Sequence, residues 1–302
     1  MKEKLFVLLL CLAVFPAALH AQTQPVKYMN YAGYNPFTGR NDMQLNMVYQ
    51  FPDPARYGAG PYPVFVWVPG TFASYRDLMS LTFVMNMSAR GFVAASVQYN
   101  YALMIQTCWE YQQRADSIFE SARADSAMGK LCAMSGVNCG KGIVTAGQSQ
   151  GAALAIMAKN YEPNVQATLG MSVSDTFQWL GLSLWCLDKQ YTAIPSNRLM
   201  IVNGEDDFYY GGQLPVERVS GLSCPSGSSE CWSPDGSGSG WYLIQDSEVT
   251  DGNADHCYQM VGDCVLGFFD PIWFLGTADW SLKSNLDWLA TLGTKRIFAP
   301  GR

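Results

Sequence analysis

The strongest sign of chemistry in this chain is Ser149, which lies in the run Gly147-Gln148-Ser149-Gln150-Gly151. This is the G-x-S-x-G pattern, in which a serine sits on a sharp turn between a strand and a helix with its hydroxyl exposed. A mostly apolar stretch precedes the turn at 143–146, and a stretch rich in alanine follows it at 152–159. The helix N-terminus would offer its dipole and its free N–H groups to negative charge beside the serine. We therefore predict that Ser149 is a nucleophile.

A serine hydroxyl needs a base that takes its proton, and histidine is the usual base because its pKa lies near neutrality. The chain contains two histidines, His20 and His256. His20 falls in the N-terminal segment that we expect to be removed, so His256 is left as the only candidate base. A surface histidine without a role is the alternative interpretation of His256.

An acid that orients His256 is expected after the apolar stretch 199–202, where a glycine and an acidic cluster follow. Asp207 is the first choice, Asp206 is the second, and Asp175, after the preceding apolar stretch, is the third. A solvated turn is the alternative for the acidic cluster. The chain order of serine, aspartate and histidine is the order found in α/β-hydrolases.

The negative charge that develops on an attacked carbonyl oxygen needs hydrogen-bond donors. One predicted donor is the backbone N–H of Gln150, directly after the nucleophile. The second is expected in the loop after the valine-rich run 64–68. Thr71 is the first candidate there, through its N–H and its hydroxyl, and Phe72 is the next.

Short apolar runs alternate with longer stretches of helical periodicity along most of the chain. This alternation predicts an α/β fold with a mostly parallel central sheet and helices on both faces. Ligands bind such sheets at the C-terminal ends of the strands, which is where Thr71, Ser149 and Asp207 fall. We expect strands at 27–31, 43–51, 64–68, 92–97, 143–146, 167–173, 199–202 and 241–245, and helices at 77–90, 107–129, 152–159 and 281–292.

The N-terminus is typical of a secretory signal peptide. Two lysines within the first four residues precede an apolar run from Leu5 to Leu19, and Ala21 offers a small residue for cleavage. The apolar run is shorter than a comfortable membrane span. We expect residues 1–21 to be removed and residues 22–302 to form a single catalytic domain. The mature protein is expected to be secreted, extracellular or periplasmic, without a stable membrane anchor.

Residues 22–302 are acidic, because without Lys2, Glu3 and Lys4 the chain has 17 basic and 24 acidic residues, a net charge of −7. This balance argues against nucleic acid or an anionic membrane as a partner, and we expect a monomer. We predict no cofactor and no metal. The run 251–255, Asp-Gly-Asn-Ala-Asp, resembles the start of a calcium loop but lacks the glycine and glutamate required later in that loop, so we predict a turn.

Eight cysteines follow residue 21, and an even number in an exported chain indicates a disulfide framework. Free thiols or a zinc site are the alternatives, but these cysteines lack the CxxC spacing of zinc sites. Three pairs are each seven residues apart and would close short loops, and elimination leaves a fourth pair. One bridge would begin directly after His256 and hold its loop. The expected pairs are Cys132–Cys139, Cys224–Cys231, Cys257–Cys264 and Cys108–Cys186.

Taken together, these residues resemble the α/β-hydrolase superfamily over nearly all of residues 22–302. The run 147–154, GQSQGAAL, is similar to the Gly-Tyr-Ser-Gln-Gly-Ala-Ala-Leu elbow of cutinases and acetylxylan esterases, over the elbow and its helix alone. Pro69-Gly70 stands where many members have His-Gly, and Gln148 replaces an aromatic residue. The resemblance implies an α/β-hydrolase fold and ester hydrolysis through an acyl-enzyme. A small cap fits the limited room between 173 and 199.

Residues near the predicted turns are candidates for contact with substrate. They are Phe72 in the oxyanion loop, Gln148 in the elbow, Trp179 in a short insertion, and Phe208 at the start of a long aromatic stretch. We expect the substrate to be a short acyl ester, a cutin-like or polyhydroxyalkanoate polyester, or an acylated plant polysaccharide. The alternatives are a carbohydrate esterase of acetylxylan or feruloyl type, a serine peptidase, and a hydrolase-fold protein that binds a ligand without catalysis.

Overall fold

The computed structural model describes residues 24–100, 107–177, 182–209, 212–262, 264 and 267–294. The predicted signal peptide at 1–21 and the candidate Trp179 therefore lie outside the described residues. The main sheet contains β1 (Lys27–Asn35), β2 (Arg40–Gln50), β3 (Val64–Val68), β4 (Val93–Val97), β5 (Ile143–Gln148), β6 (Val165–Met171), β9 (Leu199–Gly204), β10 (Glu230–Trp232) and β11 (Gly240–Ile244).

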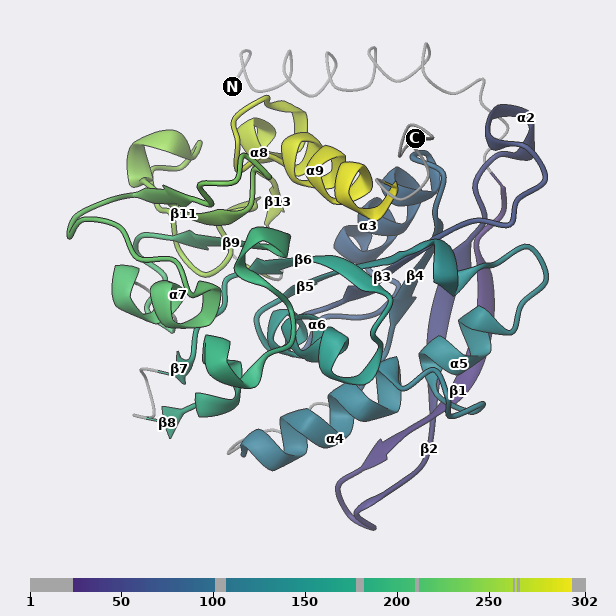
Figure 1. The fold of residues 1–302 in the computed structure, drawn as a ribbon. Helices are drawn as coiled ribbons and strands as arrows, with labels where there is room; N and C mark the ends of the chain where they lie inside the picture. Colours follow the sequence, from purple (N-terminus) through teal and green to yellow (C-terminus); the bar gives the residue numbers. More distant parts are fainter. Residues whose placement is uncertain are drawn as a thin grey trace.

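These nine strands lie in the order β1-β2-β4-β3-β5-β6-β9-β11-β10 (Figure 1). Within the run β4-β3-β5-β6-β9-β11, each strand is parallel to the next. Strand β2 is antiparallel to both β1 and β4, and β10 is antiparallel to β11. The prediction of a mostly parallel sheet is confirmed.

Strand β3 shows why the sheet needs cover on both faces. All five of its residues are buried. Because side chains alternate along a strand, Val64, Val66 and Val68 pack into one apolar core, while Phe65 and Trp67 pack into a second. A strand that is apolar on both sides is stable only where both faces are covered.

Helices cover the two faces separately (Figure 1). The first core includes residues of α4 (Cys108–Phe119), α5 (Ala127–Cys132), α6 (Gln150–Tyr161) and α7 (Gln213–Ser220). The second core includes residues of α3 (Leu78–Ser88), α8 (Pro271–Leu275) and α9 (Leu282–Thr294). Among the described residues, no helix has both the length and the apolar character that crossing a bilayer requires.

Smaller elements connect these layers. Between β6 and β9, the residues that the structure describes (172–177 and 182–198) form a short hairpin and three single turns of 3₁₀-helix. The remaining elements are α2 (Pro54–Tyr57), β7 (Thr176–Phe177), β8 (Leu182–Ser183), β12 (Met260–Val261), β13 (Phe268–Phe269), and the 3₁₀ turns Cys139–Lys141, Trp185–Leu187, Lys189–Tyr191, Ser196–Arg198 and Asp246–Glu248.

The prediction of one long helix over 107–129 is wrong. Helix α4 ends at Phe119 because Glu120 is extended, with φ −70° and ψ 94°. A second helix, α5, begins after Ser126, whose hydroxyl accepts the Gly129 N–H at 2.9 Å. In the turn between them, Arg123 Nη1 lies 2.7 Å from Asp116 Oδ2. Both halves have helical periodicity, so the apolar pattern alone did not reveal the turn.

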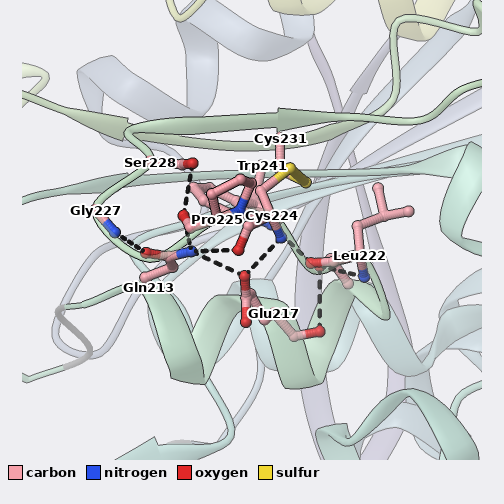
Figure 2. The surroundings of a disulfide bond; sticks show 10 residues. Gln213, Glu217, Leu222, Cys224, Pro225, Gly227, Ser228, Cys231 and Trp241 are labelled. Atoms are coloured by element: carbon pink, nitrogen blue, oxygen red, sulfur yellow. Dashed lines mark hydrogen bonds between the residues drawn. A yellow bond between two sulfur atoms is a disulfide. The ribbon is translucent and has the colours of Figure 1, made fainter.

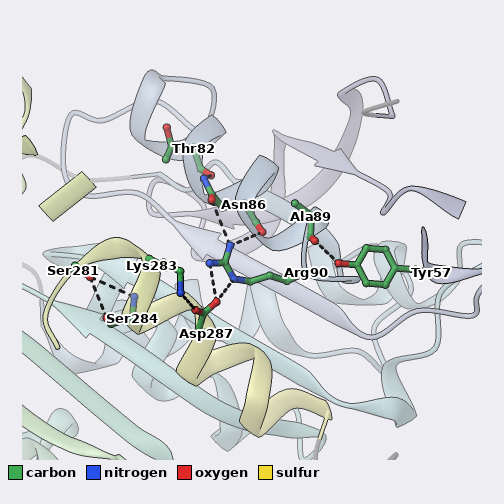
Figure 3. Close-up of polar contacts among 9 residues, drawn as sticks. All are labelled: Tyr57, Thr82, Asn86, Ala89, Arg90, Ser281, Lys283, Ser284 and Asp287. Carbon is green, nitrogen blue, oxygen red and sulfur yellow. Dashed lines mark hydrogen bonds and ion pairs between the residues drawn. The ribbon is translucent and has the colours of Figure 1, made fainter. Parts of the chain in front are cut away.

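An ion pair on the second face joins Arg90, two residues after the end of α3, to α9 (Figure 3). Arg90 Nε donates to Asp287 Oδ1 at 2.9 Å, and Lys283 Nζ donates to Asp287 Oδ2 at 2.7 Å. Burial alone would raise the pKa of Asp287, but the hydrogen bonds and charges of Lys283 and Arg90 outweigh burial and lower it. The C-terminal helix is thereby held against α3, the helix that follows the candidate oxyanion loop.

All four disulfides join the predicted pairs. Figure 2 shows the bridge between Cys224 and Cys231, which ties the loop after α7 to edge strand β10. Gln213 Nε2 donates to the carbonyl oxygen of Cys224 at 3.1 Å, and Glu217 Oε1 accepts the Cys224 N–H at 2.9 Å. The bridge and these hydrogen bonds together fix α7 against the end of the sheet.

The four disulfides should differ in how much they stabilise the fold. Cys108–Cys186 spans 78 residues, whereas Cys132–Cys139 spans seven. Closing the longer loop removes more entropy from the unfolded chain, about 4.5 against about 2.4 kcal/mol. We expect replacing Cys108 and Cys186 by alanine to lower the free energy of unfolding by about 2 kcal/mol more than replacing the shorter pair. Denaturant titration of both double variants measures this, and equal losses would contradict it.

Candidate active site

The C-terminal edge of the parallel strands collects the predicted reactive residues. Thr71 follows β3, Ser149 follows β5, Asp207 follows β9, and His256 lies in the loop after β11. Parallel strands end at one common edge of a sheet, which is where ligands bind in this type of fold. The sheet therefore brings together residues that are far apart in the sequence.

Ser149 occupies a strained turn between β5 and α6. Its backbone has φ 55° and ψ −125°, a region that residues other than glycine rarely enter. A Cβ atom at Gly147 would lie 2.3 Å from the carbonyl oxygen of Gly151, and one at Gly151 would lie 2.1 Å from that of Val68. Both flanking positions of the G-x-S-x-G pattern therefore require glycine. Ser149 keeps 9% of its surface exposed.

Asp207 and His256 are in direct contact. Asp207 Oδ2 lies 2.8 Å from His256 Nδ1, and Asp207 Oδ1 accepts the Tyr209 N–H at 3.0 Å. The Asp207 side chain is fully buried. An ionised carboxylate can only accept hydrogen bonds, so with Asp207 ionised the proton between the two groups would be carried by Nδ1 of His256. Its Nε2 then carries the lone pair that a base needs.

The two alternative acids lie in other environments. Asp206 is exposed, and its backbone N–H donates to the carbonyl oxygen of Ala254 at 3.0 Å. Asp175 is paired with Arg218, whose Nη2 donates to Asp175 Oδ1 at 2.8 Å. The geometry therefore favours Asp207 over both alternatives.

The loop that carries His256 is attached to the strand ends around the elbow. The Ser172 hydroxyl, directly after β6, donates to the carbonyl oxygen of His256 at 2.8 Å. Gln148 Nε2 donates to Cys257 Sγ at 3.8 Å, and Cys257 is bridged to Cys264. These contacts place the histidine loop beside the elbow. Sequence reasoning missed Ser172, because it lay inside a predicted strand and no local pattern marks it.

The candidate oxyanion donors lie on two neighbouring elements. Gln150 is the first residue of α6, and the first four N–H groups of a helix have no partner within it. A Cβ atom at Gly70 would lie 3.5 Å from Ser149 Cβ, so the loop after β3 passes directly beside Ser149. Thr71 follows in that loop and is half-buried. Phe72, the second candidate, has φ 64°.

Aromatic side chains flank this edge. Phe72 is 68% exposed and Phe208 is 56% exposed. The Tyr209 ring meets the His256 imidazole edge to face at 4.9 Å between centroids, and Phe208 lies 4.2 Å from Tyr209. Gln148 is half-buried, and its side-chain amide donates a hydrogen bond to Cys257 Sγ.

These features establish the architecture. A mostly parallel sheet carries helices on both faces, and a strained serine links a central strand to the helix behind it. The chain has an α/β-hydrolase fold. Serine, aspartate and histidine also occur in the chain order of that fold, after β5, β9 and β11.

Comparisons with known proteins give distant likenesses. No family model and no curated protein sequence matches this chain. Among solved structures it is similar to a hypothetical protein from Pseudomonas aeruginosa, with 15% identity, 57% of this chain and 48% of that chain covered, and a TM-score of 0.38. The chain thus spans about half the length of that protein.

Two further structures are similar at 14% identity with TM-scores of 0.41. One is an α/β serine hydrolase without a lid from Xanthomonas campestris, with 62% of this chain and 75% of that chain covered. The other is a protein of unknown function from Agrobacterium tumefaciens, considered a candidate α/β hydrolase, with 65% and 76% covered. The resemblance of the elbow to cutinases and acetylxylan esterases stays a prediction.

The acidic run 251–255 of this α/β-hydrolase fold forms a turn. Asp251 Oδ2 accepts the Gly262 N–H at 2.9 Å, and Asp255 Oδ1 accepts the Cys257 N–H at 2.7 Å. Burial raises the pKa of Asp255. Within the described part of the chain, no group of three or more His, Cys, Asp or Glu side chains could hold a metal ion.

Two surface hollows lie elsewhere in the hydrolase fold. One, of about 240 Å³, is lined by residues of β1 and β2 together with Asp125 and Lys130. The other, of about 430 Å³, is lined by α7 residues, Cys224 and Ser226. Neither hollow is lined by a residue of the candidate site.

Proposed function

We propose that this protein is an exported serine hydrolase that cleaves carboxylic esters through an acyl-enzyme. The observation that carries the proposal is the 2.8 Å contact between buried Asp207 and His256. His256 is the only histidine after residue 20, and it lies at the sheet edge that presents Ser149. A carboxylate, an imidazole and a strained serine at one edge are the parts that ester hydrolysis by a serine needs.

In the first half of the proposed reaction, Ser149 Oγ attacks the carbonyl carbon of the ester. His256 Nε2 takes the hydroxyl proton as the new C–O bond forms, and the carbonyl oxygen becomes an oxyanion. The N–H groups of Gln150 and Thr71 are proposed to bind that oxyanion. The intermediate then collapses, the bond to the alcohol oxygen breaks, and the alcohol leaves with the proton from His256. An acyl group remains on Ser149.

In the second half, a water molecule replaces the alcohol. His256 Nε2 takes a proton from the water as its oxygen attacks the acyl carbon. The second intermediate collapses to release the carboxylic acid, and the proton returns to Ser149 Oγ. Asp207 keeps the imidazole in one tautomer and stabilises its positive charge in both halves, a role worth about 10⁴ in kcat in other serine hydrolases. This chemistry calls for no cofactor.

The proposed substrate class is a bulky or polymeric ester. Phe72 lies in the loop after β3, Phe208 lies in the loop after β9, and both side chains are more than half exposed. Large exposed aromatic side chains beside a reactive serine suit contact with an apolar acyl chain, an aromatic ester or a polyester surface. An acylated polysaccharide is the second candidate, on the resemblance of the elbow to acetylxylan esterases.

Export is proposed from the cysteine chemistry. Four disulfides occur in the described structure, and disulfides persist in oxidising compartments outside the cytosol. This agrees with the signal peptide predicted at 1–21, with extracellular or periplasmic localisation. We also propose that the protein acts as a monomer, and its acidic charge favours an ester substrate over nucleic acid as a partner.

Purified protein should hydrolyse p-nitrophenyl acetate, butyrate or laurate. In Ser149→Ala and His256→Ala, kcat should fall by about 10⁴ or more, because nucleophile and base act as a unit. Release of p-nitrophenol measures the rates, and circular dichroism shows that each variant is folded. Folded wild-type protein that turns over none of the three esters would contradict the proposed function. An active His256→Ala would contradict the role of His256, since no other histidine follows residue 20.

The assignment of the acid can be tested with two adjacent aspartates. We expect Asp207→Asn to lower kcat by about 10⁴, because an amide in this place favours the wrong tautomer of His256. Asp206→Asn is the matched control and should keep the wild-type kcat, because Asp206 is exposed. Steady-state kinetics with one p-nitrophenyl ester compares the two. A larger loss in Asp206→Asn would reverse the assignment.

A further inference from the structure

Ser172 is a strained and fully buried residue at the end of β6. Its φ is 53°, and none of its surface is exposed. A residue other than glycine in this region costs free energy and persists only where the surrounding structure fixes it. Residues of this kind often occur at functional sites, and Ser172 lies beside one.

The contacts of Ser172 and its neighbour join the nucleophile to the base. The carbonyl oxygen of Met171 accepts the Ser149 N–H at 2.9 Å. The Ser172 hydroxyl donates to the carbonyl oxygen of His256 at 2.8 Å. Two consecutive residues therefore hold the main chain of Ser149 on one side and the main chain of His256 on the other.

Strand β9 fixes this short segment in place. The Ser172 N–H donates to the carbonyl oxygen of Val202 at 2.9 Å. Asn203 Oδ1 accepts the Val173 N–H, and Asn203 Nδ2 donates to the Val173 carbonyl oxygen, both at 2.9 Å. Asn203 is fully buried. The segment 171–173 is thus held at several points by the same strand whose following loop carries the candidate acid.

We propose that Ser172 is a positioning residue that sets the distance between His256 and Ser149. Asp207 orients the imidazole ring through Nδ1, whereas Ser172 holds the main chain that carries the ring. The inference rests on the proposed function, in which His256 Nε2 takes the proton of Ser149. A misplacement of about 1 Å in such a constellation can cost about 10²-fold in rate.

Two substitutions separate the hydroxyl from the backbone strain. Ser172→Ala removes the hydroxyl and keeps the unfavourable φ, whereas Ser172→Gly removes the hydroxyl and relieves the φ. We expect both variants to lower kcat roughly 10- to 100-fold and to leave KM unchanged, because neither touches the aromatic residues proposed to bind substrate. Ser172→Gly should be the more stable of the two, so it decides the matter if Ser172→Ala does not fold.

Ser96→Ala is the matched control. Ser96 on β4 is also fully buried, and its hydroxyl has no hydrogen-bond partner in the described structure. Removing this hydroxyl should leave kcat at the wild-type value. A loss of kcat in Ser172→Gly together with a normal rate in Ser96→Ala separates positioning of His256 from a general effect of losing a buried hydroxyl.

A measurement on His256 itself makes the test independent of activity. Protein labelled with ¹⁵N-histidine has imidazole signals from His256, and from His20 as well where residues 1–21 are retained, and His256→Gln assigns them. We expect the Nδ1–H resonance of His256 to shift in both Ser172 variants and to stay in place in Ser96→Ala. Wild-type kcat and an unshifted resonance in Ser172→Gly would overturn the inference. Wild-type protein without esterase activity would overturn the proposed function, and the resonance would still decide whether Ser172 positions His256.

Discussion

The close approach of three backbone segments at the elbow is the constraint on which the site depends. Strand β3, strand β5 and helix α6 meet where Gly147 and Gly151 leave no space for a Cβ atom. The chain can pass from β5 into α6 there only with Ser149 in a strained conformation, which costs about 1–3 kcal/mol. Burial of β3 and β5 on both faces offsets this cost. This turn places Ser149 at the C-terminal end of β5 and at the N-terminus of α6.

The residues with strained backbones and the candidate catalytic residues lie at the same edge of the sheet. In the described part of the chain, the residues other than glycine with positive φ are Phe72, Ser149 and Ser172. They lie close behind β3, β5 and β6, the three adjacent strands around the elbow. Each is held by a rigid buried strand, as backbone strain at functional sites generally is. The next strand, β9, leads into the loop of Asp207, so four neighbouring strands supply most of the site.

The sequence predicted the features of the fold and the candidate site that a local motif marks or that depend on a residue type occurring only once or a few times. The glycines around Ser149, the single histidine after residue 20 and the spacing of the cysteines left few choices. The turn after Phe119 was missed because helical periodicity continues on both sides of it. The bond from Ser172 to His256 joins residues 84 positions apart, and no periodicity or motif records such a tertiary hydrogen bond. Asp207 could be preferred over Asp206 from its position three residues after Gly204, but the burial of Asp207 and the exposure of Asp206 are seen only in the folded chain.

We propose that Ser149 is a nucleophile activated by His256. Treating the protein with a fluorophosphonate and mapping the adduct by mass spectrometry of its peptides tests this claim directly, without knowledge of the natural substrate. On this proposal we expect one adduct, on Ser149, in the wild-type protein, and none in His256→Ala over the same time. An adduct on a different residue, or labelling of His256→Ala at the wild-type rate, would contradict it.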